Sequence, residues 1–319
     1  FGFLRMGATA LAAQADGANN EAEVRASLLR GAGVGLAAGL VFIILQTPIR
    51  EGAFALFSGS NAAEDAGRAY FDARIWGAPA ALAGFAVYGW LIGIGRTGWA
   101  LALQAALNLV NVALSIGFVY GLDLGVAGVA AASAVSQWVM LAAGALIIWR
   151  VFAARGRSGV ARLSDAGAVK RLFAVNRDIF LRTLFLLAGI LWFNEASLRE
   201  GEAVLAGNAI LLQFISISAY VLDAFAHVTE SLAGKAVGSK SWTQLKRAMR
   251  LSSELALAGA GVLAALIWFG GESFVALMTT DPDARATAQR FLVWCALAPL
   301  IGAPSWQLDG LMIGATRGP

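Results

Sequence analysis

The chain contains about eight long apolar stretches, most of them bounded by charged residues, between Leu28 and Arg317. Most approach or exceed the roughly 20 residues that an α-helix needs to cross the hydrocarbon core of a bilayer. They are Gly31–Ile49, Ile75–Ile94, Leu101–Leu122, Leu124–Trp149, Leu184–Phe193, Ala203–Ala226, Leu255–Phe269 and Phe291–Ala315. A helix can cross lipid because it satisfies its own backbone hydrogen bonds. The sequence therefore predicts an all-α, polytopic membrane helix bundle.

The composition agrees with this prediction and excludes several classes of function. Hydrophobic residues make up 59% of the chain and charged residues 14%, against about 25% charged in soluble domains. The single cysteine, Cys295, excludes a disulfide within the chain. A single histidine argues against an enzyme, and we expect no metal site and no cofactor. The net charge of +4 reflects basic connections between helices, so no nucleic-acid partner is expected.

The connections between the apolar stretches alternate in charge. Basic residues gather around Arg25 and Arg30, at Arg96, in Arg150–Arg171, in Lys235–Arg250 and at Arg317. The intervening connections are acidic, with residues such as Glu51, Asp123, Glu200 and Asp281. Because short cytoplasmic loops carry an excess of Lys and Arg, we expect the basic connections in the cytoplasm and the acidic ones outside.

The chain also matches itself at a shift of 221 residues. Three separate blocks keep this register without a gap: Leu11–Gly17 over Leu232–Gly238, Glu51–Leu56 over Glu272–Leu277, and Gly89–Arg96 over Gly310–Arg317. Internal repeats of this kind are typical of secondary transporters, and a repeat of the same topology implies an axis along the membrane normal. Gly7–Arg96 should therefore overlay Val228–Arg317.

The repeat predicts two pseudo-symmetric six-helix lobes, about twelve helices in all. In this register Phe1 lies inside a helix, and further helices are expected beyond Pro319. We therefore expect a chain that is incomplete at both ends. The predicted division is an N-terminal lobe over 1–154, a charged cytoplasmic linker over 155–170 and a C-terminal lobe over 171–319.

The residues around the repeat resemble the multidrug and toxic compound extrusion (MATE) family, in its DinF-like branch. The resemblance rests on four segments: Phe3–Ala18, Asn176–Leu184, Asn208–Glu230 and Leu308–Arg317. It implies a cation-coupled antiporter that uses H⁺ or Na⁺, exports organic and often cationic compounds, and works by rocking two lobes. It also implies a monomer in the lipid bilayer of the bacterial inner membrane.

Polar residues in the first lobe are candidates for an ion or substrate site. Gln104, Asn108 and Asn111 are spaced to share one face of a helix. The resemblance places an Asn of the family's ion or proton site here, but Ser115 stands where that branch usually has an Asp. Tyr88, on a neighbouring helix, is a further candidate. Hydrogen bonding between helices is an equally good interpretation of the amides, and an ordinary buried tyrosine of Tyr88.

The second lobe has a polar stripe at helical spacing. Asp223, His227 and Glu230 fall at i, i+4 and i+7, and together they could relay protons or tie the lobe together. Asp309, on a later helix, needs a partner from another helix, because Arg317 is too far along the same one. The i, i+4 spacing of Asp178 and Arg182 predicts an ion pair within one helix.

A lipid-linked oligosaccharide flippase of a related fold is the main alternative function. Such a protein should have a strongly cationic central cavity that holds pyrophosphate. Here only Arg5, Arg74, Arg177 and Arg182 lie near or within the helices, which favours the antiporter.

Overall fold

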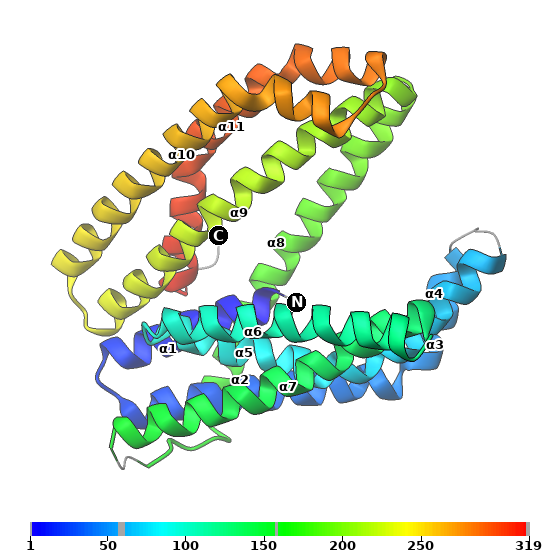
Figure 1. Ribbon diagram of the computed structural model, residues 1–319. Coiled ribbons are helices and arrows are strands. Elements are labelled where there is room, and N and C mark those ends of the chain that lie inside the picture. Colours follow the sequence, from blue (N-terminus) through cyan, green and yellow to red (C-terminus); the bar gives the residue numbers. More distant parts are fainter. Residues whose placement is uncertain (1, 57–60, 157–158, 317–319) are drawn as a thin grey trace. The chain divides into compact units, whose positions relative to one another are not determined.

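The computed structural model describes residues 2–56, 61–156 and 159–316, and every regular element in them is helical (Figure 1). Eight helical stretches in these residues are long and apolar enough to cross a membrane. Each overlaps one of the eight apolar stretches of the sequence, so the predicted all-α membrane bundle is confirmed. The chain divides into two compact units, Phe1–Asn176 and Arg177–Pro319. The finer division, with its linker at 155–170, stays a prediction.

The first unit is built around one central helix, α5. Its elements are α1 (Gly2–Gly17), α2 (Glu21–Ile44), α3 (Gln46–Leu56), α4 (Asn61–Arg74), the 3₁₀ turn η1 (Ile75–Gly77), α5 (Ala78–Gly93), α6 (Thr97–Ile116), the π-helical turn η2 (Gly117–Gly121) and α7 (Gly125–Ala154). Helix α5 packs against α1, α2 and α7. On α5 the fully buried indole of Trp90 donates a hydrogen bond to the carbonyl of Val24 at 2.8 Å and meets the ring of Phe152 edge-on. These contacts join α2, α5 and α7 into one core.

The second unit consists of long helices. Helix α8 (Ala166–Arg199) enters it across the division between the units, and α9 (Glu202–Gly238), α10 (Trp242–Met278) and α11 (Pro282–Gly314) follow. Helices α9, α10 and α11 all pack against one another. Their core includes Phe214 and Phe274, whose rings meet edge-on with centroids 4.9 Å apart.

The helix ends repeat at the predicted shift of 221 residues. Helices α1 and α5 end at Gly17 and Gly93, and their counterparts α9 and α11 end at Gly238 and Gly314. The turn after α1 places Asn19 at φ 54°, and the turn after α9 places Lys240 at the same φ. The register read from the sequence is therefore present in the backbone. Arg317, the last residue of the predicted overlay, lies outside the described residues.

Two glycine contacts repeat in the same register. A Cβ atom on Gly89 would lie 2.1 Å from the carbonyl oxygen of Arg5, and one on Gly310 would lie 2.4 Å from that of Ala226. One helical turn further, Gly93 faces Thr9 and Gly314 faces Glu230 in the same way. Only a residue without a Cβ allows backbones to approach this closely. The contact of α1 with α5 is thus built like the contact of α9 with α11.

The apolar stretch Gly31–Ile49, expected as one helix, is interrupted. Helix α2 ends at Ile44 and α3 begins at Gln46. Pro48 has no N–H to donate to the carbonyl of Ile44, four residues earlier, which accounts for the break. The counterpart of Pro48 in the second unit is Phe269, and α10 runs through this position without interruption.

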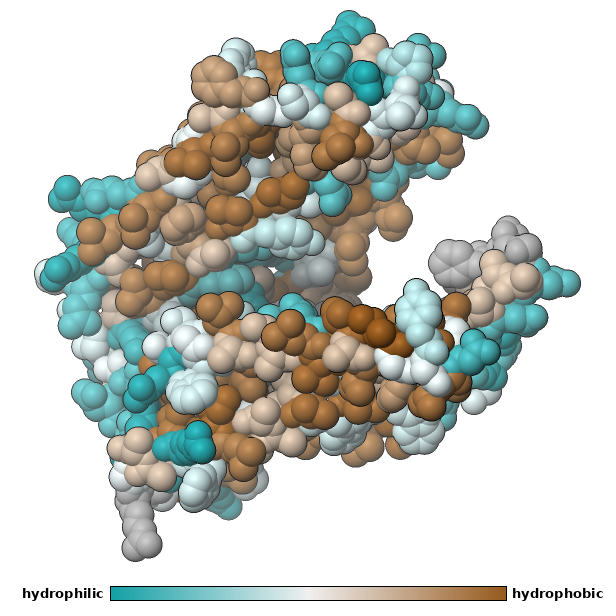
Figure 2. All heavy atoms as spheres, viewed as in Figure 1, coloured by the Kyte–Doolittle hydropathy of each residue, from teal (hydrophilic) through white to brown (hydrophobic). Residues whose placement is uncertain are grey.

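The surfaces of both units suit a bilayer. Figure 2 shows hydrophobic side chains along the middle of the visible helices, and hydrophilic ones gathered toward the helix ends. Large apolar side chains are exposed on several helices, including Ile44, Leu109, Trp149 and Phe269. In water such a surface would aggregate, whereas lipid solvates it.

Candidate functional site

The polar candidates of the first unit form two hydrogen-bonded pairs. On α6, Gln104 donates to the amide oxygen of Asn108 at 3.3 Å, and Asn108 is exposed. Asn111 is half-buried and donates to the hydroxyl of Ser133 on α7 at 2.9 Å. Asn111 therefore links two membrane helices, which is the packing role that the sequence left open.

Tyr88 and Ser115 take different positions. Tyr88, on α5, packs against the apolar cluster that contains Trp90. Ser115 is half-buried on α6, one turn beyond Asn111. The prediction that the polar face of α6 lines a cavity with Tyr88 stays a prediction.

The stripe on α9 brings a histidine and a carboxylate together. Nδ1 of His227 lies 3.8 Å from Oε2 of Glu230, whose side chain is only 1% exposed. Asp223 is half-buried one turn before His227. Next to the stripe, the hydroxyl of Thr229 donates to the amide oxygen of Gln307 at 2.5 Å, which connects α9 to α11. Both histidine and glutamate can change protonation state, so this pair could bind or pass a proton.

Asp309 has the cross-helix partner that it needs, and that partner corrects one prediction. Arg182 on α8 donates to both carboxylate oxygens of Asp309 on α11, at 2.5 and 2.7 Å. The predicted pair of Asp178 with Arg182 is therefore wrong, and Asp178 instead accepts from its neighbour Arg177 at 2.8 Å. Both hydrogen bonds come from Nη1 of Arg182, and this contact with a facing helix could not be read from i, i+4 spacing within one helix.

A cavity of about 770 Å³ in the second unit was not predicted. It lies between α8, α9 and α11, and aromatic side chains from two of these helices line it: Phe193, Phe291 and Trp294. Two residues of opposite charge, Glu200 and Arg290, also line it. The spacing of Phe291 and Trp294, three residues apart on one helix, was the available signal. In an apolar sequence it is indistinguishable from ordinary packing.

The comparisons with known proteins agree on one family. The MatE family model matches residues 1–116 and 179–318, which is most of the chain. The chain belongs to the MatE family. Its members are multidrug and toxic compound efflux transporters, so this protein is a multi-pass membrane transporter and not an enzyme.

Individual members of the MatE family resemble the chain over much of its length. DNA damage-inducible protein F of Escherichia coli is 33% identical over 316 residues, which cover 99% of this chain and 69% of that protein. The probable multidrug resistance protein NorM of Acinetobacter baylyi is 26% identical over 221 residues, 66% of this chain and 49% of NorM. A crystal structure of MATE in complex with MaD3S matches with a TM-score of 0.89 at 19% identity, over 99% of this chain and 71% of that one. The structural match shows the shared fold.

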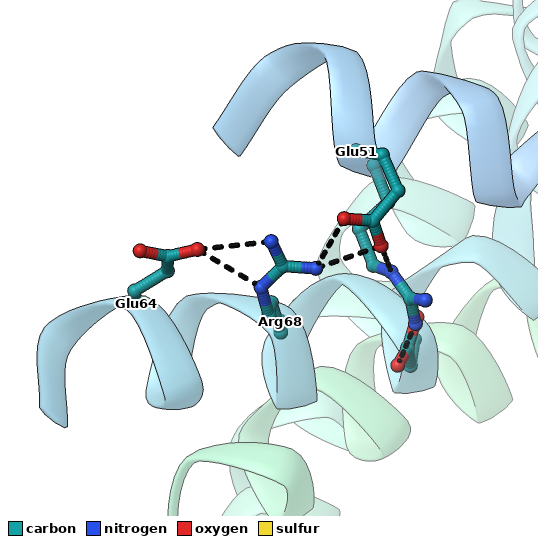
Figure 3. A network of polar contacts seen from close by, with 5 residues as sticks. Glu51, Glu64 and Arg68 are labelled. Atoms are coloured by element: carbon teal, nitrogen blue, oxygen red, sulfur yellow. Dashed lines mark hydrogen bonds and ion pairs between the residues drawn. The ribbon is translucent and has the colours of Figure 1, made fainter. Parts of the chain in front are cut away.

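In this MatE chain the acidic connection near α3 is organised by arginines. Arg68 on α4 lies between two carboxylates, Glu64 on its own helix and Glu51 on α3, with hydrogen bonds of 2.7 to 3.1 Å (Figure 3). Arg50 bonds Glu51 at 3.0 Å and also holds Asp72. The hydrogen bond from Arg68, and next that from Arg50, lower the pKa of Glu51 below its ordinary value. Charge in this connection is therefore largely neutralised within the unit.

Proposed function

We propose that this MatE transporter is a cation-coupled antiporter that exports organic, mainly cationic, compounds in exchange for H⁺ or Na⁺. The two lobes would rock against each other around the bound compound. We place the protein as a monomer in the bacterial inner membrane, with its basic connections in the cytoplasm. Family membership and the alternating charge of the connections support this proposal.

The observation that carries the substrate class is the aromatic lining of the cavity between α8, α9 and α11. Rings such as those of Phe193, Phe291 and Trp294 attract cations through their negatively charged faces. Glu200 adds a carboxylate at the same cavity, while the guanidinium of Arg290 lies 5.4 Å from the ring centre of Phe291. A volume of about 770 Å³ falls in the range of small-molecule sites.

Polar groups inside the membrane helices support ion coupling. Coupling requires a group that binds the ion within the bilayer, where polar side chains are otherwise unfavourable. The first unit offers Asn111 with Ser133, and the second offers Glu230 with His227. We favour the first unit because the family resemblance places the ion site on α6.

Transport into everted membrane vesicles tests the proposal. A fluorescent cationic dye is supplied, and its uptake is driven in one arm by a proton gradient and in another by a sodium gradient. Asn111→Ala should reduce uptake in the arm that drives the wild type, and Trp294→Ala should raise the dye concentration needed for half-maximal uptake. The matched controls are Gln244→Ala, an exposed amide at the start of α10, and Trp268→Ala, whose exposed indole lies on α10.

Each arm of this experiment has an outcome against the proposal. Uptake that neither gradient drives would contradict coupling, and would favour the lipid-linked oligosaccharide flippase. Unchanged uptake by Asn111→Ala, at matched amounts of inserted protein, would remove that residue from the ion site. An equal effect of Trp268→Ala and Trp294→Ala would remove the cavity from substrate binding.

A further inference from the structure

An arginine lies beside a break between two helices of the first unit, at the start of the apolar stretch Ile75–Ile94. Residues 61–93 form one helical stretch made of α4, η1 and α5, in which α4 is hydrophilic and the part from Ile75 onward is apolar. Arg74 is the last residue of α4 and directly precedes the apolar segment that begins at Ile75. The 3₁₀ turn η1 follows at once, before Pro79, which cannot donate to the carbonyl of Ile75.

The broken helix is held in place from α7. The indole of Trp138 donates to the carbonyl of Trp76, within η1, at 3.0 Å. Gly77 lies so close to α7 that a Cβ would come within 2.7 Å of the Cα of Ala134. The break is therefore a fixed part of the unit, and the position of Arg74 is set by it.

Arg74 lines a cavity of about 350 Å³ between α2, α4, α5 and α7. The walls are mainly apolar and include four aromatic side chains from three helices: Phe42, Tyr70, Phe71 and Phe85. Gln137 on α7 adds an amide, and none of the described residues that line the cavity is a carboxylate. An apolar chamber with one cation and one amide at its wall has the composition of a ligand site.

Two of the three carboxylates on α4 bind other arginines. Asp72 accepts two hydrogen bonds from Arg50, at 2.6 and 2.8 Å. Glu64 is held by Arg68 on the same helix. Across residues 2–56, 61–156 and 159–316, no ion pair involves Arg74. The half-buried guanidinium of Arg74 is therefore open to a charge-assisted hydrogen bond with an anionic ligand.

We propose that this cavity binds a single-chain amphiphile with a carboxylate head. The guanidinium of Arg74 would bind both carboxylate oxygens, and the amide of Gln137 can donate a further hydrogen bond. The aromatic walls enclose the apolar body of the ligand. The site has the opposite charge preference to the cavity of the second unit, so the inference does not rest on the proposed export of cations.

Binding to the purified protein in an uncharged maltoside detergent tests this assignment. Four ten-carbon probes differ only in the head group: decanoate, decanol, decyltrimethylammonium and decyl phosphate. Calorimetric titration should give decanoate an affinity about tenfold or more above that of decanol, as expected for a charge-assisted hydrogen bond. Arg74→Gln should remove this difference, whereas Arg96→Gln, which removes an exposed arginine in the turn before α6, should keep it.

Comparing variants in one detergent cancels the partition of the probes into micelles. Ala81→Phe provides a second variant, because Ala81 lines the cavity and a larger side chain would fill it while the charge of Arg74 remains. It should weaken decanoate and decanol alike. The proposal is overturned if Arg74→Gln binds decanoate as tightly as the wild type, or if Ala81→Phe leaves both affinities unchanged. Preference for decyl phosphate over decanoate would overturn the carboxylate assignment.

Discussion

Arg182 and Asp309 join α8 to α11 by two hydrogen bonds between one guanidinium and one carboxylate, although the residues lie 127 positions apart. The two side chains are 38% and 29% exposed, so the pair is only partly shielded. It ties the middle of α8 to α11.

Asp309→Asn should destabilise the second unit, because it leaves the guanidinium of Arg182 without its counter-charge. The loss should be about 1–3 kcal/mol, since charged hydrogen bonds are worth that much and partial exposure limits the effect. Thermal unfolding of the purified protein measures it. Asp178→Asn, which breaks the exposed pair with Arg177, is the control and should change Tm little. Equal changes in Tm for the two variants would contradict a special role for Arg182 and Asp309.

Gly310→Ala should also lower the stability, by about 1–3 kcal/mol, which is typical of overpacking. Its new methyl group would overlap the carbonyl oxygen of Ala226, and this contact is backbone, which cannot rotate away. Gly261→Ala on α10 is the control, since nothing lies within 4 Å of a Cβ there. That variant should gain about 1 kcal/mol from helix propensity. The two variants should therefore change the stability in opposite directions. A change in the same direction would show that the close backbone contact does not restrict the residue at position 310.

The network around Glu51 should make stability depend on pH. Arg68 first, and then Arg50, lower the pKa of this carboxyl in the folded protein. A lowered carboxyl pKa contributes stability at pH values above the ordinary value of 4.5, and the contribution is lost as pH falls through the lower folded pKa. The difference in Tm between wild type and Glu51→Gln should therefore be present at neutral pH and shrink in acid. Asp65→Asn, an exposed change on α4, should show no such trend.

Asp223→Asn distinguishes two roles for the stripe on α9. We expect lower protein yield and a lower Tm with an unchanged pH profile of transport, because the stripe lies among contacts that hold α9 to α11. His227→Gln, one turn further, should behave in the same way. Normal yield with a shifted pH profile in either variant would show that the stripe relays protons.

The repeat could be predicted from the sequence because it depends only on the order of residues along the chain. Blocks such as Gly89–Arg96 and Gly310–Arg317 keep one register, and glycines at shared positions set where backbones can approach. Helix ends at Gly17 and Gly238 then follow from the same register. The membrane helices themselves could be predicted from the length of the apolar stretches and from the charged residues between them.

The partners of individual side chains could not be predicted in the same way. Spacing within one helix indicated Asp178 for Arg182, but a long guanidinium can reach a facing helix, and helix-to-helix distance is absent from the sequence. The chamber beside Arg74 depends on the break at η1 and on Gln137, which lies 63 residues later. Such sites require knowledge of which helix faces are in contact.

The carbonyl of Arg5 lies too close to residue 89 to leave room for a Cβ there, and the carbonyl of Ala226 lies too close to residue 310. Helices packed this closely cannot slide past each other without a backbone collision. We therefore expect α1 and α5 to move as one rigid body during the transport cycle, and α9 and α11 as another. An engineered disulfide between α1 and α5, or between α9 and α11, should leave the transport rate unchanged. Helix α8, in contrast, is held to α11 by the side chains of Arg182 and Asp309 and not by such a backbone contact, so it can shift by changes of side-chain rotamer alone.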